Sequence, residues 1–413
     1  MEFPGCFPTV ERVTLQAERE TRVAVPTQPR AKTRLTVLDG LRGVAALVVV
    51  FHHLDLVAGP FLRQSGTGPG SLYWWISETP LKLLSAGTEA VLVFFVLSGL
   101  VVCLPTLGKK FSWASFLTGR MLRLYLPVWA SLIVGTVLIW VLPRNDASVT
   151  SGAWVDTSNA TSTALGAILN QASLTTASYD INNVLWSLRW ELLFSVLLPL
   201  FVAIAIVTRR WWAIAIGVAF AMTIVGAFTH VDALRYLPAF FMGTMMAVRL
   251  DAIREWTARR QQRQRARLWS AGIITVSLLF VIASALALPI APSGSVAGTL
   301  LGQLALLGAA GLVLAAIGAP PLRRVLDSRA AQWLGTVSFS LYLVHVPIIA
   351  TLAFLLGDAN WWLVALLTIP IALLVAWGFH RVVERPSHRL ARAASRAVAT
   401  RIERFSARRP ANI

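Results

Sequence analysis

The chain has 413 residues, of which 56% are hydrophobic and only 14% are charged, and its mean hydropathy is +0.67. This composition excludes an ordinary soluble enzyme and predicts an all-α fold, a polytopic bundle of transmembrane helices. The formal net charge of +18 would also suit a nucleic-acid-binding protein. The arginines, however, lie in loops between apolar runs, so we expect a membrane surface as the partner and no nucleic acid.

The two ends of the chain differ from its middle. Residues 1–34 mix Arg, Glu, Thr and Pro without an apolar core, so they do not resemble a cleaved signal peptide, and we interpret them as a disordered basic cytosolic leader. Residues 35–386 form the predicted transmembrane domain. Residues 387–413 repeat arginine among small and apolar residues, which suits either an amphipathic helix on anionic lipid or a disordered basic cytosolic tail.

A transmembrane helix needs about 20 mainly apolar residues. Ten stretches meet this requirement: 35–57, 83–106, 124–143, 184–207, 211–229, 233–250, 269–291, 298–318, 334–356 and 360–379. Lysine and arginine gather in alternate loops, which by the positive-inside rule places those loops and both termini in the cytoplasm. We therefore expect a multi-pass protein of the plasma membrane.

The first predicted span carries ionisable residues, which a bilayer segment usually excludes. Arg42 and His53 are eleven residues apart, so they share a helix face and lie about 16 Å apart along the axis. The predicted orientation places Arg42 in the cytoplasmic half and His53 near the outer side. Such residues usually face a cavity or a partner, although Asp39 could simply neutralise Arg42.

The fourth span opens with LWSLRWE, residues 185–191, in which Ser187 and Glu191 share a face at a depth comparable with His53. A carboxylate beside a histidine is a common general-base arrangement, because the acid fixes the tautomer and stabilises the imidazolium. We therefore predict His53 and Glu191 as catalytic residues. The alternative is a structural ion pair that holds two helices together.

Two further arginines lie at the cytoplasmic end of the third span. Arg120 and Arg123 are three residues apart and share a helix face. Guanidinium groups bind phosphate well, although anchoring of the span would also explain an arginine at this depth. Together with Arg42, the pair predicts a phosphate site on the cytosolic side. The cysteines show no spacing typical of a metal site, and we predict no metal.

Six motifs in order resemble those of the membrane acyltransferase family 3, whose members O-acylate sugars and other hydroxyl-bearing molecules with acyl-CoA donors. The resemblance covers about residues 35–386. The motifs are LDGLRGVAALVVVFHH (38–53), AVLVFFVLSG (90–99), RMLRLYLP (120–127), LWSLRWE (185–191), SFSLYLVHVP (338–347) and VERP (383–386). Each motif alone is weak, but six in family order are specific.

The resemblance implies that His53 is the base of acyl transfer and that Glu191 supports the site. It also implies that the donor is acyl-CoA, with acetyl-CoA as the default, held by Arg42, Arg120 and Arg123. A central substrate cavity would be lined by Trp186, Ser187, Ser340, Tyr342 and His345. The other expected partners are the lipid bilayer and a hydroxyl-bearing acceptor, most simply a carbohydrate.

One position departs from the family pattern. Many members carry an acidic residue before the paired Phe of the second helix, where this chain has Leu92. Glu89, one turn earlier, is the alternative carboxylate. Direct transfer to the acceptor is the expected route, with an acyl-enzyme on Ser187 or on a histidine left open. A secondary transporter of an anionic solute and a non-catalytic member of the fold also remain open.

Overall fold

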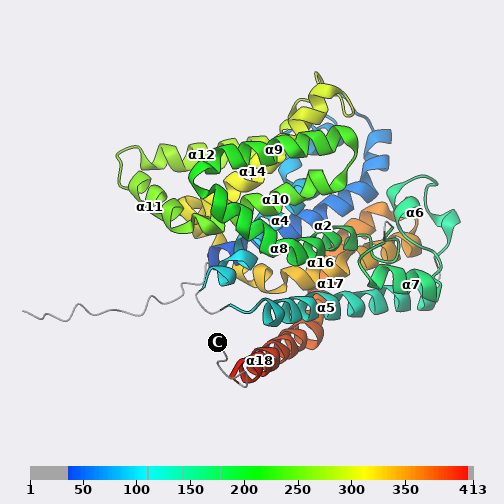
Figure 1. The fold of residues 1–413 in the computed structure, drawn as a ribbon. Helices are drawn as coiled ribbons and strands as arrows, with labels where there is room; N and C mark the ends of the chain where they lie inside the picture. The colour runs from blue at the N-terminus through cyan, green and yellow to red at the C-terminus, as the bar shows by residue number, and fades with distance from the viewer. Residues whose placement is uncertain (1–35, 109–110, 143, 177, 408–413) are drawn as a thin grey trace, which may run out of the picture. The chain divides into compact units, whose positions relative to one another are not determined.

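The computed structural model describes residues 36–407 except 109–110, 143 and 177, and all regular elements in this part of the chain are helices (Figure 1). The predicted all-α fold is confirmed. A π-helical turn over His380–Glu384 joins α17 to α18. The helices are α2 (Thr36–Gln64), α3 (Leu72–Ser77), α4 (Gly87–Cys103), α5 (Trp113–Val141), α6 (Trp154–Ser158), α7 (Leu165–Ala172), α8 (Leu185–Thr208), α9 (Trp212–Thr229), α10 (Asp232–Val248), α11 (Leu250–Gln261), α12 (Ala266–Val281), α13 (Ala283–Leu286), α14 (Val296–Gly318), α15 (Pro320–Leu326), α16 (Arg329–Leu356), α17 (Trp361–Phe379) and α18 (Arg385–Ala407).

Seven helical stretches of the described chain are long and apolar enough to cross a membrane, so the protein is a multi-pass membrane protein. They are Thr36–Gln64, Gly87–Leu107, Trp113–Val141, Leu185–Thr229, Val296–Gly318, Arg329–Leu356 and Asp358–Arg404. The predicted number of ten is not confirmed. Helices α10 and α12 have only 17 and 16 residues, short of the usual length of about 20, and α8 and α9 belong to one stretch.

Helices α2 and α16 pack closely because glycines face each other between them. A Cβ atom on Gly43 would lie 2.3 Å from the amide nitrogen of Gly335, and a Cβ on Gly335 would lie 2.3 Å from the carbonyl oxygen of Asp39. Small residues allow two helix backbones to approach in this way. His53 and His345, each ten residues beyond its glycine, also meet. The two helices therefore run parallel and in register.

Glycines and aromatic rings also join α4 to α10 and α8. A Cβ atom on Gly99 of α4 would lie 2.1 Å from the carbonyl oxygen of Phe240 on α10. The ring of Phe240 stacks between those of Phe95 and Phe194, with centroids 4.5 and 4.6 Å apart. This packing brings the polar face of α8, which carries Glu191, against α4.

Helix α18 lies along α5 (Figure 1). The Ser115 hydroxyl donates to the carbonyl of Ser395, and the Ser395 hydroxyl donates to the carbonyl of Ser115, both at 2.7 Å. Gly119 leaves the room for this contact, since a Cβ there would lie 2.2 Å from Oγ of Ser395. The part of the C-terminal basic segment that forms α18, Arg385–Ala407, is thus packed on the helical bundle. At the opposite end of the bundle lie α6 and α7.

Candidate active site

Two histidines from different helices meet in the interior. His345 Nε2 on α16 lies 3.2 Å from His53 Nδ1 on α2, and the two side chains are 0% and 7% exposed. The sequence places both residues in the candidate site, but their contact depends on the packing of α2 against α16. The structure therefore brings together two predicted site residues that are far apart in the chain.

The surrounding carbonyl groups determine where the protons of this pair lie. His53 Nδ1 is 2.9 Å from the carbonyl oxygen of Val49, and His345 Nδ1 is 2.9 Å from that of Leu341. A carbonyl oxygen only accepts hydrogen bonds, so both Nδ1 atoms carry a hydrogen in the neutral rings. His345 Nε2 then accepts from His53 Nδ1. The lone pair of His53 is consequently on Nε2, the nitrogen that can take up a proton.

The segment between α5 and α8 covers the histidine pair. The ring of Trp154, the first residue of α6, lies 5.1 Å from that of His53 between centroids. Asn182 is fully buried, and its amide donates to the carbonyl of Leu343 at 2.9 Å and to Ser131 at 3.2 Å. These bonds fasten the covering segment to α16 and α5.

A buried arginine fastens the same segment at a second point. Arg144 is 8% exposed, donates to the carbonyl of Ala160 and lies over the ring of Phe354. Burial lowers the pKa of Arg144 to about 10, so its guanidinium remains charged at neutral pH. Ser148 adds a further contact to α16, since its hydroxyl donates to the carbonyl of Phe354 at 2.9 Å.

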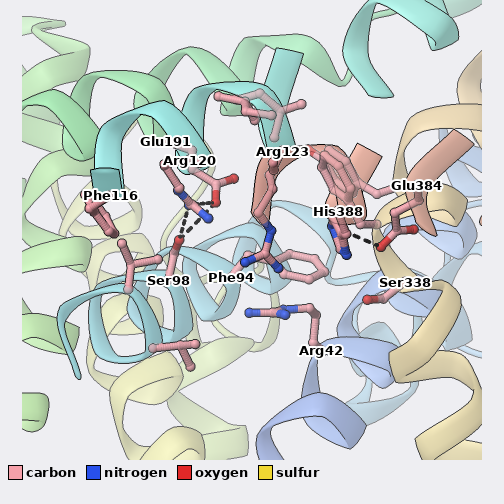
Figure 2. Close-up of a pocket in the computed structure, with 18 of the residues that line it drawn as sticks. Arg42, Phe94, Ser98, Phe116, Arg120, Arg123, Glu191, Ser338, Glu384 and His388 are labelled. Atoms are coloured by element: carbon pink, nitrogen blue, oxygen red, sulfur yellow. Dashed lines mark hydrogen bonds and ion pairs between the residues drawn. The ribbon is translucent and has the colours of Figure 1, made fainter. Parts of the chain in front are cut away.

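A cavity of about 620 Å³ lies at the other end of the helices, between α2, α4, α5, α8, α16 and α18 (Figure 2). Its volume is within the usual range of small-molecule sites, about 300–1,000 Å³. Among the described residues, the ionisable side chains that line it are five arginines, one histidine and two glutamates: Arg42, Arg120, Arg123, Arg392, Arg396, His388, Glu191 and Glu384. The cavity is therefore suited to an anionic ligand.

One wall of the cavity is held by an ion pair. The guanidinium of Arg120 contacts the carboxylate of Glu191 and donates to Ser195 at 3.2 Å, and Ser98 donates to the same carboxylate at 3.0 Å. The sequence-based hypothesis places Glu191 beside His53. In the structure its carboxylate faces Arg120 and Ser98 instead, while His53 is bonded to Val49 and His345.

The opposite wall contains a second acidic group, from the π-helical turn. Glu384 accepts hydrogen bonds from Ser340 at 2.5 Å and from His380 at 3.0 Å, and His388 lies 3.9 Å from its other oxygen. Ser340 is predicted to line the substrate cavity. In the structure it contacts Glu384, and Glu384 lines the cavity. Trp186, also predicted to line it, packs against the ring of Tyr236 at 5.2 Å. Neither is among the lining residues in the described chain.

Arg42 and Arg123 point toward each other between these two walls (Figure 2). Both acidic groups of the cavity already have partners. None of the ion pairs found in residues 36–407, outside the gaps, involves Arg42, Arg123, Arg392 or Arg396. Positive charge is therefore left over at the centre and mouth of the cavity, where it can bind an anion.

The inner end of the cavity lies next to the histidine pair. Tyr342 lines the cavity, its hydroxyl is 2.6 Å from that of Ser187, and it donates to the carbonyl of Val184 at 3.3 Å. The rings of Tyr342 and His345 are 5.9 Å apart between centroids. One aromatic side chain thus separates the arginine-rich cavity from the pair that contains His53.

The structure adds residues to the site that the sequence-based prediction did not include. An ionisable side chain occurs at every fourth position, at Glu384, His388, Arg392 and Arg396, and all four line the cavity. That spacing places them on one stripe of a helix, a signal that the sequence already carried. No group of three or more His, Cys, Asp and Glu side chains in the described residues could hold a metal ion.

Comparison with known proteins identifies the family. A model of an acyltransferase domain, acyltransferase family 3, matches residues 35–381. The acyltransferase MdmB of Streptomyces mycarofaciens is 27% identical over 402 residues, which cover 88% of this chain and 94% of that protein. The O-acetyltransferase PaAT-1 of Phomopsis amygdali is 26% identical over 372 residues, 78% of this chain and 73% of that protein. No solved structure matches. The chain therefore belongs to acyltransferase family 3 and is an acyltransferase that moves groups other than aminoacyl groups.

Proposed function

We propose that the protein is an O-acyltransferase of the plasma membrane that moves an acyl group, by default acetyl, from acyl-CoA to a hydroxyl group, with His53 as the general base. The observation that carries the proposal is the connection of two sites. A cavity lined by five arginines of the described chain ends at Tyr342, and the ring of Tyr342 lies against that of His345 in the histidine pair.

Acyl-CoA fits the charge and the length of this arrangement. Its phosphate groups would bind the guanidinium groups of Arg42, Arg120 and Arg123, which pair well with phosphate. Arg42 lies eleven residues before His53, about 16 Å along α2, and an extended pantetheine arm spans such a distance. The positive-inside rule places this end of the bundle and both termini on the cytosolic side, where acyl-CoA is found.

The proposed reaction is a direct transfer. His53 Nε2 takes the proton of the acceptor hydroxyl while the oxygen attacks the thioester carbonyl carbon. The carbon–sulfur bond breaks, the acyl group remains on the acceptor oxygen, and the CoA sulfur receives the proton back from His53. His345 accepts the hydrogen bond from His53 Nδ1 throughout, which holds the ring in orientation and spreads the positive charge of the intermediate imidazolium.

The remaining predicted residues support this arrangement. Glu191 holds Arg120 in the wall of the cavity, so it acts on donor binding. Tyr342 and Ser187 close the inner end through their mutual hydrogen bond. Opening of that bond joins the cavity to His53 and lets the thioester reach the base.

The acceptor approaches from the side covered by Trp154. The relatives support an acetyl group and a hydroxyl acceptor, since one is named an acyltransferase and the other an O-acetyltransferase. A carbohydrate, as part of a glycan, glycolipid or glycosylated small molecule, is the acceptor class that we propose.

The test follows release of free CoA from acetyl-CoA by the protein in nanodiscs, with and without a panel of sugar acceptors. Wild type is compared with His53→Ala and with His230→Asn, which alters an exposed histidine in the turn between α9 and α10. We expect acceptor-dependent release from wild type and His230→Asn, and a loss of about 10²–10⁴-fold in His53→Ala, the usual contribution of a general base.

Two results would contradict the proposal. If the folded His53→Ala protein released CoA at the wild-type rate, His53 would not be the base. If wild type neither released CoA nor bound acetyl-CoA, the arginines would only set the orientation of the spans in the membrane. Transport of an anionic solute or a non-catalytic role would then be the better explanation.

A further inference from the structure

Helix α18 contributes one face to the arginine-rich cavity. Its lining residues follow the pattern i, i+3, i+4, i+7 and i+8 of one helix face: His388, Ala391, Arg392, Ser395 and Arg396. Arg389 and Arg401 of the same helix are exposed and are not among the lining residues of the described chain. All four arginines are exposed, but in the described chain only Arg392 and Arg396 line the cavity.

The packing of α18 on α5 shows how deep these arginines lie. Ser395 bonds to Ser115, whereas Gly119 of α5 approaches both Ser395 and Ala391. Residue numbers thus fall along α18 as they rise along α5, so the two helices are antiparallel. Arg396 lies at the level of Ser115, near the start of α5, and Arg392 lies one turn deeper.

Positions along α5 also give the distance from the mouth of the cavity to the reaction centre. A Cβ on Gly135 of α5 would lie 3.8 Å from the Cγ atom of Pro347, two residues beyond His345 on α16. Gly135 is twenty residues after Ser115, about 30 Å along the helix. Arg123, only eight residues after Ser115, lies about 12 Å deeper than Ser115. The arginines of α18 are therefore near the mouth, the end of the cavity farthest from His53.

We propose that Arg392 and Arg396 bind the 3′-phosphate of the CoA donor, an inference that rests on the function proposed above. In a CoA thioester the pyrophosphate lies between the pantetheine arm and the nucleotide, and the 3′-phosphate is on the ribose beyond it. A thioester at the inner end therefore places the 3′-phosphate nearest the mouth. Two guanidinium groups one turn apart meet it there, and Arg42 and Arg123 remain for the pyrophosphate.

The head group of an anionic lipid offers the same phosphate chemistry, so the experiment separates the two sources. Binding and turnover of acetyl-CoA and of 3′-dephospho-acetyl-CoA are measured in nanodiscs of phosphatidylcholine alone, and repeated with phosphatidylglycerol added. The variants are R392A/R396A, the charge-conserving R392K/R396K, and R389A/R401A, which removes two arginines of the same helix that do not line the cavity in the described chain.

We expect wild type to bind acetyl-CoA about 10–100-fold more tightly than the dephospho donor, a typical effect of charge-assisted hydrogen bonds. R392A/R396A should lose this preference, because its affinity for acetyl-CoA falls to that for the dephospho donor, which itself is unchanged. R392K/R396K should keep part of the preference and R389A/R401A all of it. Added phosphatidylglycerol should alter none of these ratios.

Three results would overturn the inference. One is a wild-type protein that binds both donors equally. Another is an equal loss of affinity for both donors in R392A/R396A, which would assign the arginines to the pyrophosphate or to folding. The last is a difference between wild type and R392A/R396A only in the presence of phosphatidylglycerol, which would assign them to lipid. Failure of the proposed function itself has another signature, a wild-type protein that binds neither donor.

Discussion

His345 Nε2 lies 3.2 Å from His53 Nδ1, although the two residues are 292 positions apart in the chain. In many general-base arrangements a carboxylate holds the histidine, whereas the hydrogen-bond partners of His53 in the described chain include no carboxylate. Here the carbonyl of Val49 and the neutral ring of His345 take the place of the acid. Both accept from Nδ1, so the free lone pair of His53 is on Nε2 without a negative charge beside it.

Replacing His345 should therefore lower the turnover number without altering donor affinity. In His345→Leu, His53 Nδ1 keeps the carbonyl of Val49, so the tautomer is retained and one stabilising bond to the imidazolium is lost. The expected decrease in kcat is about tenfold, equivalent to one hydrogen bond of about 1.4 kcal/mol. The KM for acetyl-CoA should not change. Steady-state CoA release at varied donor concentration measures both constants.

His345→Gln is the matched control, because its side-chain oxygen can accept the bond from His53. It should recover several-fold of the lost kcat relative to His345→Leu. Equal loss in the two variants, or a kcat of His345→Leu as low as that of His53→Ala, would contradict a positioning role. Thermal unfolding of each variant shows whether the bundle is intact.

The glycine contact between α2 and α16 should be necessary for the histidine pair to form. In Gly43→Ala the new methyl group would lie 2.3 Å from the backbone nitrogen of Gly335, so the helices must separate. Overpacking of this kind costs about 1–3 kcal/mol. We expect a lower unfolding temperature and a large loss of CoA release, measured on the same preparations.

Gly59 provides the control in the same helix. A Cβ added there meets no atom within 4 Å, so Gly59→Ala should leave unfolding temperature and turnover close to wild type. A Gly43→Ala protein as stable and active as Gly59→Ala would show that the register of α2 and α16 does not depend on this contact.

The fold was predictable as far as it depends on local sequence. Apolar runs identify the helices and their approximate ends, because spanning length and hydropathy are properties of each segment. The number of spans was harder to predict, since α10 and α12 are short. The position of the covering segment, which contains α6 and α7, was not predictable from local sequence. Its hydrogen bonds to Leu343 and Ser131 come from distant parts of the chain.

The residues of the site were largely predictable, but the contacts between their side chains were not. The helical period placed Arg42 and His53 on one face, and Ser187 and Glu191 on another. Which side chain meets Glu191 depends on how α4, α5 and α8 pack together. That packing pairs the carboxylate with Arg120. The stripe from Glu384 to Arg396 was visible as a four-residue spacing, yet only the packing of α18 on α5 turns it toward the cavity.

The partner of Glu191 leads to a prediction that separates donor binding from chemistry. In Glu191→Gln the side chain keeps its shape and an acceptor for Ser98 but loses the ion pair that orients Arg120. The two ion-paired side chains are 18% and 23% exposed. We expect the KM for acetyl-CoA to rise about 3–10-fold, as for a loss of about 1 kcal/mol. The kcat should stay within about twofold of wild type.

Glu255→Gln serves as the control, because Glu255 forms an ion pair with Arg259 in which both side chains are 71% exposed. Exposed pairs contribute little, so this variant should resemble wild type. A fall in kcat of Glu191→Gln with an unchanged KM would instead place the carboxylate in the chemical step.

Trp154 should protect the reaction from water and help to bind the acceptor. Its ring lies 5.1 Å from that of His53, on a segment fastened to α16 through Asn182 and Arg144. Trp154→Ala removes this cover, so water can reach His53 and replace the acceptor as nucleophile. We expect acceptor-independent CoA release to rise several-fold, the KM for the acceptor to rise about tenfold, and the KM for acetyl-CoA to remain unchanged.

Two variants make this prediction specific. Trp154→Phe keeps an aromatic cover and should retain most of the coupling between CoA release and acylation. Trp140→Ala alters a tryptophan of α5 that is 64% exposed and should behave like wild type. Product analysis by mass spectrometry, compared with total CoA release, gives the fraction of turnovers that end in hydrolysis. If Trp154→Ala raises only the KM for acetyl-CoA, the segment belongs to the donor side, and the acceptor must approach His53 from another direction.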